Sequence, residues 1–256
     1  MKIATHISFY FSQDRIKYIN KIIDETNNYE MTTDIFIHTN DSSLQDTSFN
    51  AYTNGCLKIV WHDLTNINPF YLTWKCRDLL RQQKDDYDIF MYIEDDMLVP
   101  YKAIKYWLKY NEKMIEMNCN VGFVRIEVED NIEYITDLQC KLDCLTILDN
   151  AYCVNDKNAY CAFWIYNKTE FNKFVNSEYY DINNIKNYEI REASAIGLHG
   201  SKTHWYKYTL IPIINNKCIE DCKIYHMQNN YVADKSSWCA TIKFDEAINP
   251  ACKLLT

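Results

Sequence analysis

The stretch Tyr87-Asp-Ile-Phe-Met-Tyr-Ile-Glu-Asp-Asp96 joins the most strand-like run of the chain to three consecutive acidic residues. A continuous apolar run of this length predicts a strand that is buried on both faces. Unpaired buried carboxylates are costly, so the acids are expected to face solvent, a cation, or both. Open α/β sheets bind ligands at the carboxyl ends of their strands, and the segment therefore predicts a ligand site after residue 93.

The sequence on either side of this stretch alternates between strand and helix patterns. Strands are expected over 3–9, 34–38, 57–61, 121–128 and 159–166, and helices over 14–25, 70–83, 100–117, 168–174 and 188–197. Several of the strands are followed by polar residues, as in parallel sheets. We expect an α/β, Rossmann-like three-layer sandwich with a mostly parallel central sheet. Without a repeat or a linker, the chain is expected to be one domain over 1–256.

Length and composition limit the class of protein. The 256 residues are 48% hydrophobic, which is enough for a sizeable core. The net charge is -8 and no basic stripe is evident, which disfavours nucleic-acid binding. No apolar run is long enough to span a bilayer and the first residues do not resemble a signal peptide, so a cytoplasmic location and no membrane span are expected.

Eleven cysteines are an odd number for a disulfide framework. We expect most of them to be reduced and buried. The pairs Cys140/Cys144 and Cys218/Cys222 each enclose three residues, and a four-thiolate zinc site is a minor alternative because this spacing is unusual for zinc. The first pair has a helical pattern.

Alternation of side chains lets Glu94 and Asp96 share one face of the strand while Asp95 points elsewhere. Mn²⁺ or Mg²⁺ binds one or two such carboxylates and completes its shell with water and phosphate oxygens. A metal there would stabilise the charge that develops on a departing diphosphate. The alternative is a solvated acidic turn.

The order of the first strand and helix, a polar strand end at Asn40, the helical Leu72-Thr-Trp-Lys-Cys-Arg77 and the acidic triplet resembles the nucleotide-binding half of GT-A glycosyltransferases. The triplet resembles their D-x-D signature, with Glu94 in place of the first Asp. The resemblance covers about residues 1–125 and implies Asp96 as a direct metal ligand. It also implies nucleotide-sugar contacts from Thr5, His6, Asn40, Lys75, Arg77, Glu94 and Asp95. Alternatively, His6 is a core histidine, and Lys75 and Arg77 are solvated helix charges.

The same resemblance implies an acceptor-binding half over about 126–256, with a late metal ligand. His226 follows a short apolar run and is the best candidate, ahead of His199 and His204. Glu192 at the start of a predicted helix is the favoured catalytic base, with Glu189 second. Both acids fit a charged helix start equally well. The aromatic residues Trp164 and Tyr166 are candidates for an acceptor platform or for the core.

These inferences predict a metal-dependent, inverting glycosyltransferase that moves a sugar from a nucleotide diphosphate, by default a UDP-sugar, to a glycan or glycoprotein hydroxyl. A metal-dependent nucleotidyltransferase is one alternative, although the residues after the first strand, Ser8 to Asp14, lack the Gly-rich basic loop of such enzymes. A non-catalytic sugar-binding protein on the same fold is the other. The composition would suit a microbial or large-virus protein.

Overall fold

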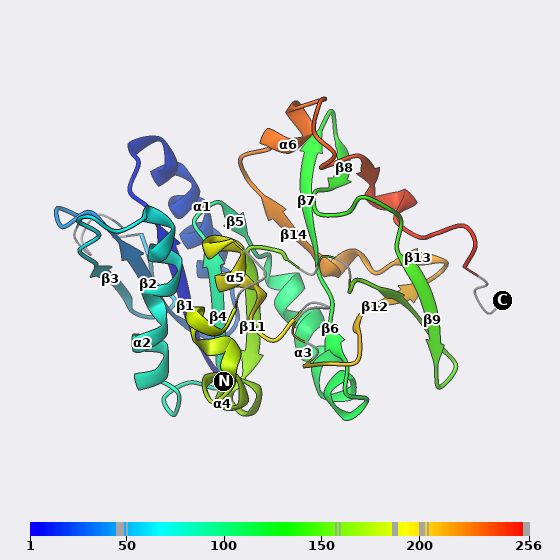
Figure 1. Ribbon diagram of the computed structural model, residues 1–256, viewed down its shortest axis with the longest axis horizontal. Coiled ribbons are helices and arrows are strands. Elements are labelled where there is room, and N and C mark those ends of the chain that lie inside the picture. Colours follow the sequence, from blue (N-terminus) through cyan, green and yellow to red (C-terminus); the bar gives the residue numbers. More distant parts are fainter. Residues whose placement is uncertain are drawn as a thin grey trace. The chain divides into compact units, whose positions relative to one another are not determined.

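The computed structural model describes residues 1–44, 49, 51–156, 158, 160–185, 189–199, 203 and 205–252. The chain divides into two compact units (Figure 1). Unit 1 comprises Met1–Met97 and Ala162–Gly197, and unit 2 comprises Leu98–Cys161 and Leu198–Thr256. The unit boundaries differ from the functional halves expected to meet near residue 125. Whether the two halves act as one domain stays a prediction.

Unit 1 is built on a five-stranded sheet with the order β11-β4-β1-β2-β3. Strands β1 to β4 are parallel, and β11 is antiparallel to β4 at one edge. The bounds are β1 Lys2–Phe9, β2 Thr32–Thr39, β3 Leu57–Trp61, β4 Ile89–Glu94 and β11 Phe163–Asn167. All six residues of β4 are buried, as expected for a central strand with both faces covered.

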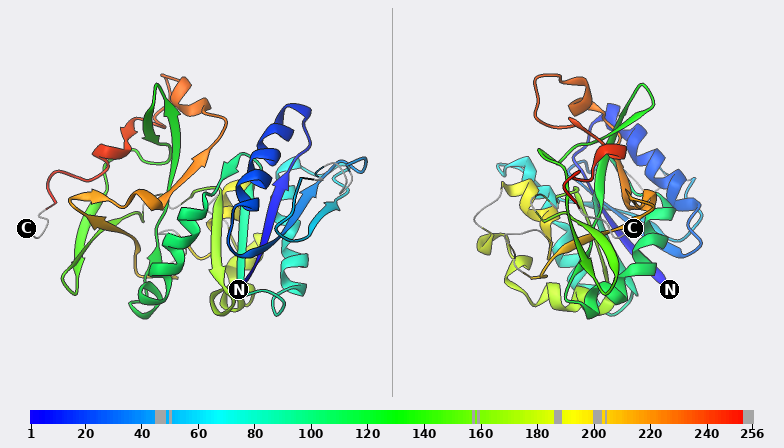
Figure 2. Two further views of the ribbon diagram at one scale, coloured as in Figure 1. Left: turned by 180° about the vertical axis from the view of Figure 1, so that it is seen from behind. Right: turned by 90° about the vertical axis from the view of Figure 1, so that its right-hand side faces the viewer.

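Helices cover both faces of this sheet. Figure 2 shows α1 on one face and α2, α4 and α5 on the other. The helical bounds are η1 Gln13–Arg15, α1 Ile16–Asn27, η3 Pro69–Trp74, α2 Cys76–Gln82, α4 Lys168–Val175, η4 Glu178–Tyr180, η5 Ile182–Asn184 and α5 Ile190–Ile196. Right-handed crossovers explain this arrangement, because the connection from β1 to β2 and the connection from β3 to β4 run in opposite directions across the sheet.

Unit 2 contains a long helix, α3 Tyr101–Glu116, and strands from two further sheets. One sheet has the order β13-β12-β10-β9, with β6 paired to β12. Its strands are β6 Asn120–Val121, β9 Asp143–Ile147, β10 Asn150–Val154, β12 Thr209–Ile214 and β13 Lys217–Cys218. Only β6 is parallel to its neighbour.

The other sheet has the order β15-β8-β7-β14 within unit 2, and β5 Met97–Leu98 lies at the unit boundary. Its strands are β7 Val124–Glu129, β8 Ile132–Ile135, β14 Lys223–His226 and β15 Ile242–Lys243. Short helical segments lie before, between and after β14 and β15, namely η6 Glu220–Cys222, α6 Asn230–Ala233 and η7 Phe244–Glu246.

The structure confirms the α/β class and most elements of unit 1. A single central sheet for the whole chain is not observed, because the described residues form three sheets. The helix expected over 70–83 is divided into η3 and α2. The strand expected over 121–128 is divided into β6 and β7, and the strand expected over 159–166 is observed as β11. Ala159 and Tyr188, at the starts of two expected elements, lie outside the described residues.

The sequence analysis missed three hairpins in unit 2. Each is closed by two adjacent residues with positive φ, namely 130–131, 148–149 and 215–216. Two-residue turns of this kind favour Asn and Asp, so Asp130-Asn131 and Asn215-Asn216 were usable signals. The segment around Cys140 and Cys144 is also not helical, because Cys144 lies in β9.

The cysteine predictions need a correction. Cys144 forms a disulfide with Cys252, and Cys140 is an exposed thiol. Cys144 is therefore unavailable to a zinc site made from the pairs Cys140/Cys144 and Cys218/Cys222. Most of the remaining cysteines are buried thiols, as expected.

Candidate functional site

The acidic segment lies where the strand order of unit 1 reverses. The chain moves from β1 outward to β2 and β3, then returns to place β4 on the opposite side of β1. A doubly wound sheet binds ligands outside the carboxyl ends of the two strands that flank such a switch point. Glu94 ends β4, and Asp95 and Asp96 form the turn that follows. The sequence placed these acids at a strand end, and the strand order places that end at the switch point.

The three acids are almost fully buried, with 8%, 4% and 6% of Glu94, Asp95 and Asp96 exposed. Arg15, which lies between β1 and α1, supplies the counter-charge of Asp95 and Asp96. Its Nε donates to Oδ2 of Asp95 at 2.7 Å, and its Nη2 donates to Oδ2 of Asp96 at 2.8 Å and to Oδ1 of Asp95. Burial raises the pKa of Asp95 to about 6, although the hydrogen bonds from Arg15 oppose the rise. The sequence analysis did not single out Arg15.

Glu94 faces a second arginine. Arg191 Nε lies 3.9 Å from Oε2 of Glu94, and Arg191 Nη2 lies 3.6 Å from Oε1 of Glu192. The other carboxylate oxygen of Glu192, Oε2, is buried and has no hydrogen-bond partner among the described residues. A buried carboxylate oxygen in this state is costly unless another group meets it. Glu192 therefore joins Glu94 in one charged cluster, and one of its oxygens can accept a proton or a hydrogen bond.

Helix α5, which carries Arg191 and Glu192, is fixed to α2 and η3. Trp74 Nε1 donates to the carbonyl of Ile190 at 2.7 Å, and Arg77 Nη2 donates to the carbonyl of Ser194 at 3.1 Å. The helix ends at Gly197, the residue expected to stop it. These two contacts, one at each end of α5, hold the helix in place beside the acidic cluster.

Arg77 is buried, so the alternative of a solvated helix charge is wrong for this residue, and its contact with a nucleotide stays a prediction. Its guanidinium packs on the rings of Trp74, Phe174 and Tyr180. It also donates to the carbonyl of Tyr179 at 3.1 Å. Only 5% of the residue is exposed, so a ligand cannot reach it without rearrangement of the surrounding aromatic side chains.

The candidate acceptor platform is also corrected. Trp164 and Tyr166 are 1% and 0% exposed and belong to the core of unit 1. Their rings stack at 5.1 Å, and Trp164 Nε1 donates to the carbonyl of Ser194 at 3.2 Å. Aromatic residues can fit either a sugar platform or a core at the sequence level, and here the two covered faces of the sheet leave them in the core.

His6 belongs to a chain of three histidines, of which His6 and His38 are buried and His62 is partly exposed. His6 Nδ1 lies 2.9 Å from His38 Nε2, and His38 Nδ1 lies 2.8 Å from His62 Nε2. At the other end, His6 Nε2 donates to Oε1 of Gln83 at 3.0 Å. Because the amide oxygen can only accept, each neutral ring carries its proton on Nε2.

Both nitrogens of His6 are thus engaged inside the protein, as in the alternative of a core histidine. Burial lowers the pKa of His6 to about 3 and that of His62 to about 4. The sequence signal for this chain was weak, because the three residues lie far apart in the sequence. Only the parallel alignment of β1, β2 and β3 brings them together.

The remaining predicted nucleotide contacts vary in exposure. Thr5 is fully buried, and its Oγ1 has no hydrogen-bond partner among the described residues. Asn40 is partly exposed, and its Oδ1 accepts from the amide of Phe11 at 2.8 Å. Lys75 is partly exposed, and its charge helps to lower the pKa of His62. Their contacts with a nucleotide stay predictions.

His226 lies in unit 2, within a second buried group of charges. Its Nδ1 is 2.5 Å from Oε1 of Glu127, whose other oxygen accepts from the amide of Val232 at 2.6 Å. A carboxylate on Nδ1 fixes the tautomer that carries its lone pair on Nε2, as in metal-binding histidines. Arg125 and Asp137 form a two-point ion pair in the same unit, with distances of 3.0 and 2.5 Å.

The metal site itself remains a prediction. In the described part of the chain, no group of three or more His, Cys, Asp or Glu side chains is arranged to hold an ion. The oxygen ligands of Glu94 and Asp96 suit Mn²⁺ or Mg²⁺, which also use phosphate oxygens and water. Arg15 now neutralises Asp96, so a cation would compete with it. Of the competitors to His226, His199 is partly buried and contacts the side chain of Asn120, and His204 lies outside the described residues.

Comparisons with known proteins identify no family. No protein-family model and no curated protein matches the sequence. The structure is similar to a crystal structure of S. aureus TarS 1-349, with 10% sequence identity and a TM-score of 0.43. The match covers 91% of this chain and 62% of that chain, so the chain spans less than two thirds of its length. Function has to be inferred from the site, because one fold supports many activities.

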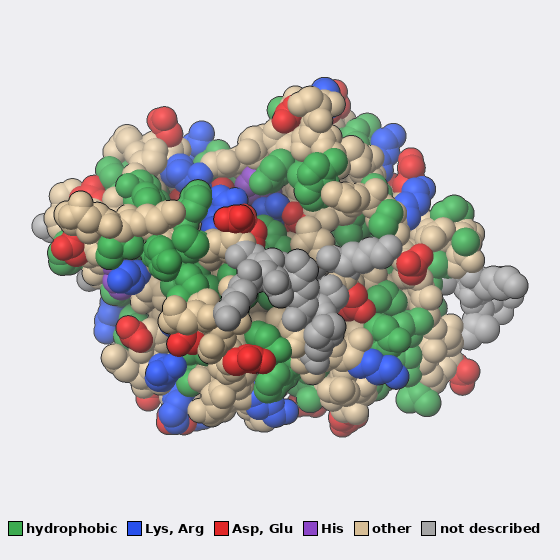
Figure 3. All heavy atoms as spheres, in the orientation of Figure 1, with side chains coloured by type: hydrophobic (Ala, Val, Ile, Leu, Met, Phe, Trp, Pro, Cys, Tyr) green, Lys and Arg blue, Asp and Glu red, His purple; other side chains and the backbone are tan. Residues whose placement is uncertain are grey.

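Two broader expectations bear on partners. None of the helices in the described ranges is long and apolar enough to cross a membrane. On the face drawn in Figure 3, Lys and Arg side chains are interspersed with Asp and Glu side chains.

Proposed function

We propose that the chain is a glycosyltransferase that transfers a sugar from a nucleotide diphosphate to an acceptor hydroxyl. The supporting observation is the position of Glu94, Asp95 and Asp96 at the switch point between β1 and β4. Nucleotides bind at this place in doubly wound sheets, and buried acids there suit a cation that accompanies a diphosphate. UDP-sugars are the first donors to test.

Mn²⁺ or Mg²⁺ is the proposed cofactor, with Asp96 as its principal ligand and Glu94 beside it. When bound, the cation would stabilise the charge on the departing diphosphate. Arg15 is then the second cationic group of the site. As the present counter-ion of Asp95 and Asp96, it can turn toward phosphate oxygens once a cation takes over the carboxylates. His226 remains a predicted further ligand.

Glu192 is the proposed general base of an inverting transfer. Its unsatisfied Oε2 can accept the proton of an acceptor hydroxyl, and α5 is held rigidly by Trp74 and Arg77. Glu189 is the weaker candidate, because it precedes the helix and is exposed. The proposed acceptors are glycans or glycoproteins, and we assign no acceptor platform now that Trp164 and Tyr166 lie in the core.

The decisive experiment is release of the nucleotide from a panel of UDP- and GDP-sugars, with and without Mn²⁺. We expect one donor to be hydrolysed slowly in the presence of Mn²⁺ and Asp96→Asn to abolish this activity. Asp24→Asn is the matched control, because Asp24 is an exposed carboxylate on α1. Nucleotide-sugar binding without turnover would instead support the non-catalytic alternative, and release of pyrophosphate from nucleoside triphosphates would support a nucleotidyltransferase.

A further inference from the structure

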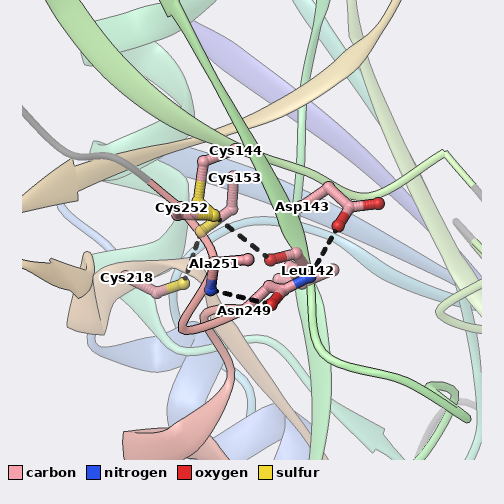
Figure 4. The surroundings of a disulfide bond; sticks show 8 residues. All are labelled: Leu142, Asp143, Cys144, Cys153, Cys218, Asn249, Ala251 and Cys252. Atoms are coloured by element: carbon pink, nitrogen blue, oxygen red, sulfur yellow. Dashed lines mark hydrogen bonds between the residues drawn. A yellow bond between two sulfur atoms is a disulfide. The ribbon is translucent and has the colours of Figure 1, made fainter.

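A disulfide closes the end of the described chain onto the sheet of unit 2. Cys144 in β9 is bonded to Cys252, with the two Cα atoms 5.6 Å apart (Figure 4). Backbone hydrogen bonds hold the same segment, since Leu142 donates to the carbonyl of Ala247 and accepts from Asn249, at 2.7 and 2.9 Å. The disulfide thus reinforces the docking of residues 247–252 against the start of β9.

A pair of thiols lies next to this disulfide. Cys153 in β10 and Cys218 in β13 have their Sγ atoms 3.1 Å apart, and both residues are buried. Cys153 is also directly opposite Cys144 in the antiparallel pairing of β9 with β10. Opposite residues in such a ladder point to the same face, with Cα atoms about 4.5 to 5.5 Å apart, within the range that a disulfide can bridge.

The two pairs differ in access. A cavity of about 460 Å³ adjoins the disulfide and is lined by Asp143, Cys144, Leu145, Thr146, Asn249, Ala251 and Cys252. A small thiol or disulfide in this cavity would meet Cys144 and Cys252. Cys153 is fully buried, with 0% exposed, and Cys218 is 4% exposed. The inner pair is therefore reached through the outer one.

We propose that these four cysteines form a thiol–disulfide exchange site, in which the cross-link moves between Cys144–Cys252 and Cys153–Cys218. The Cys153 thiolate attacks the Cys144 sulfur, which forms a Cys144–Cys153 bond and releases Cys252 as a thiolate. The Cys218 thiolate then attacks the Cys153 sulfur and releases Cys144. Two thiols and one disulfide remain throughout, and the protons lost by Cys153 and Cys218 balance those gained by Cys252 and Cys144.

The exchange changes what the cross-link holds. With Cys144–Cys252 formed, residues 247–252 are tied to β9. With Cys153–Cys218 formed, β10 is tied to β13 and Cys252 is released. The hydrogen bond with Cys218, together with burial, raises the pKa of the Cys153 thiol. Exchange is therefore slow at neutral pH and faster in alkaline solution, because only the thiolate attacks.

The test uses the full chain carrying Cys252→Ser, which leaves Cys144 as a thiol facing the cavity. The protein is incubated with oxidised glutathione at alkaline pH, quenched with acid, alkylated in denaturant and mapped by peptide mass spectrometry. With one equivalent of oxidised glutathione per protein, so that Cys144 is not modified again after its release, we expect glutathione to join Cys144 only transiently and a Cys153–Cys218 disulfide to accumulate. With Cys218→Ser added, the reaction should stop at a Cys144–Cys153 disulfide.

Cys56→Ser serves as the matched control, because Cys56 is exposed and outside the four residues. Circular dichroism establishes that each variant is folded, and Cys218→Ala replaces Cys218→Ser if the serine variant is not. Persistent glutathione on Cys144, with Cys153 and Cys218 both alkylated, would overturn the proposal. So would a disulfide that involves the nearby Cys222 in place of Cys218.

Discussion

The Nη2 atom of Arg15 lies 2.8 Å from Oδ2 of Asp96, so the residue predicted to bind a metal is neutralised by an arginine of the same unit. The same guanidinium holds Asp95. In such a site, a bound metal cation can replace the guanidinium of Arg15 as the counter-charge of the two carboxylates. Arg15 therefore links the stability of unit 1 to occupancy of the proposed metal site.

Replacement of Arg15 by alanine should destabilise the protein and increase its response to Mn²⁺. Loss of the guanidinium removes one hydrogen-bonding cation from two buried carboxylates, at a cost of about 1–3 kcal/mol. Mn²⁺ should restore part of that loss, so its effect on the melting temperature should exceed that in the wild type. Thermal melts with and without Mn²⁺ measure both effects, with Lys17→Ala on the exposed side of α1 as the control. Equal Mn²⁺ shifts in all three proteins would contradict the prediction.

The histidine chain should make folding stability sensitive to acid. In the folded protein the pKa of His6 is lowered to about 3 and that of His62 to about 4 from 6.5, so the unfolded state binds more protons as the pH falls below 6.5. The free energy of unfolding should then decrease, by up to about 1.4 kcal/mol per pH unit for each histidine that stays neutral. The loss continues until the folded-state pKa values are reached.

Urea unfolding between pH 7.5 and 4.5 measures this slope. His62→Gln keeps a hydrogen-bond donor beside His38 but cannot titrate, so its slope should be smaller than that of the wild type. Asp63→Asn is the control, because Asp63 is exposed and adjacent to His62 in the sequence. Between pH 6.5 and 5, the change of its unfolding free energy with pH should equal that of the wild type. An unchanged slope in His62→Gln would show that His62 is not held neutral.

Gly197→Ala should lower the free energy of unfolding, in part because the added Cβ would overlap the hydroxyl oxygen of Tyr166. Gly197 has a φ of 57°, and a Cβ there would lie 2.3 Å from Oη of Tyr166. With a ψ of -123° this positive φ lies in a backbone region that alanine rarely adopts, at a cost of about 1–3 kcal/mol, and the overlap adds to that cost. Tyr166→Phe removes that oxygen and leaves the nearest ring carbon at 3.3 Å, so it should partly rescue Gly197→Ala. Chemical unfolding of both single variants and the double variant measures the coupling, and strictly additive losses would refute the contact.

Glu192→Gln should lower kcat with little change in KM for the donor. The amide cannot take a proton from the acceptor hydroxyl, and general bases contribute about 10²- to 10⁴-fold in rate. Glu189→Gln is the comparison, and its effect should be much smaller because Glu189 is exposed. Steady-state transfer rates with the donor found in the panel measure both. Equal losses in the two variants, or a loss only in KM, would remove Glu192 as the base.

The sequence by itself determined the local elements and the acidic strand end. The apolar run before Glu94 and the helical spacing after Pro100 are local patterns, and β4 and α3 follow them closely. Whether a particular side chain is buried could not be predicted from the residues next to it in the sequence. Trp164 and Tyr166 have the same sequence signature in a core as on a sugar-binding surface, and only the covered faces of the sheet decided between them.

Tertiary structure alone decided which distant residues meet. Arg15 reaches Asp95 across 80 residues of sequence, and Cys144 is bonded to Cys252 across 108. Neither contact leaves a periodic trace in the chain, because the first depends on the pairing of β1 with β4 and the second on backbone hydrogen bonds between Leu142 and residues 247–249. The chemistry of the candidate site, with its arginine counter-ion, therefore appeared only once β1 and β4 were seen to be neighbours.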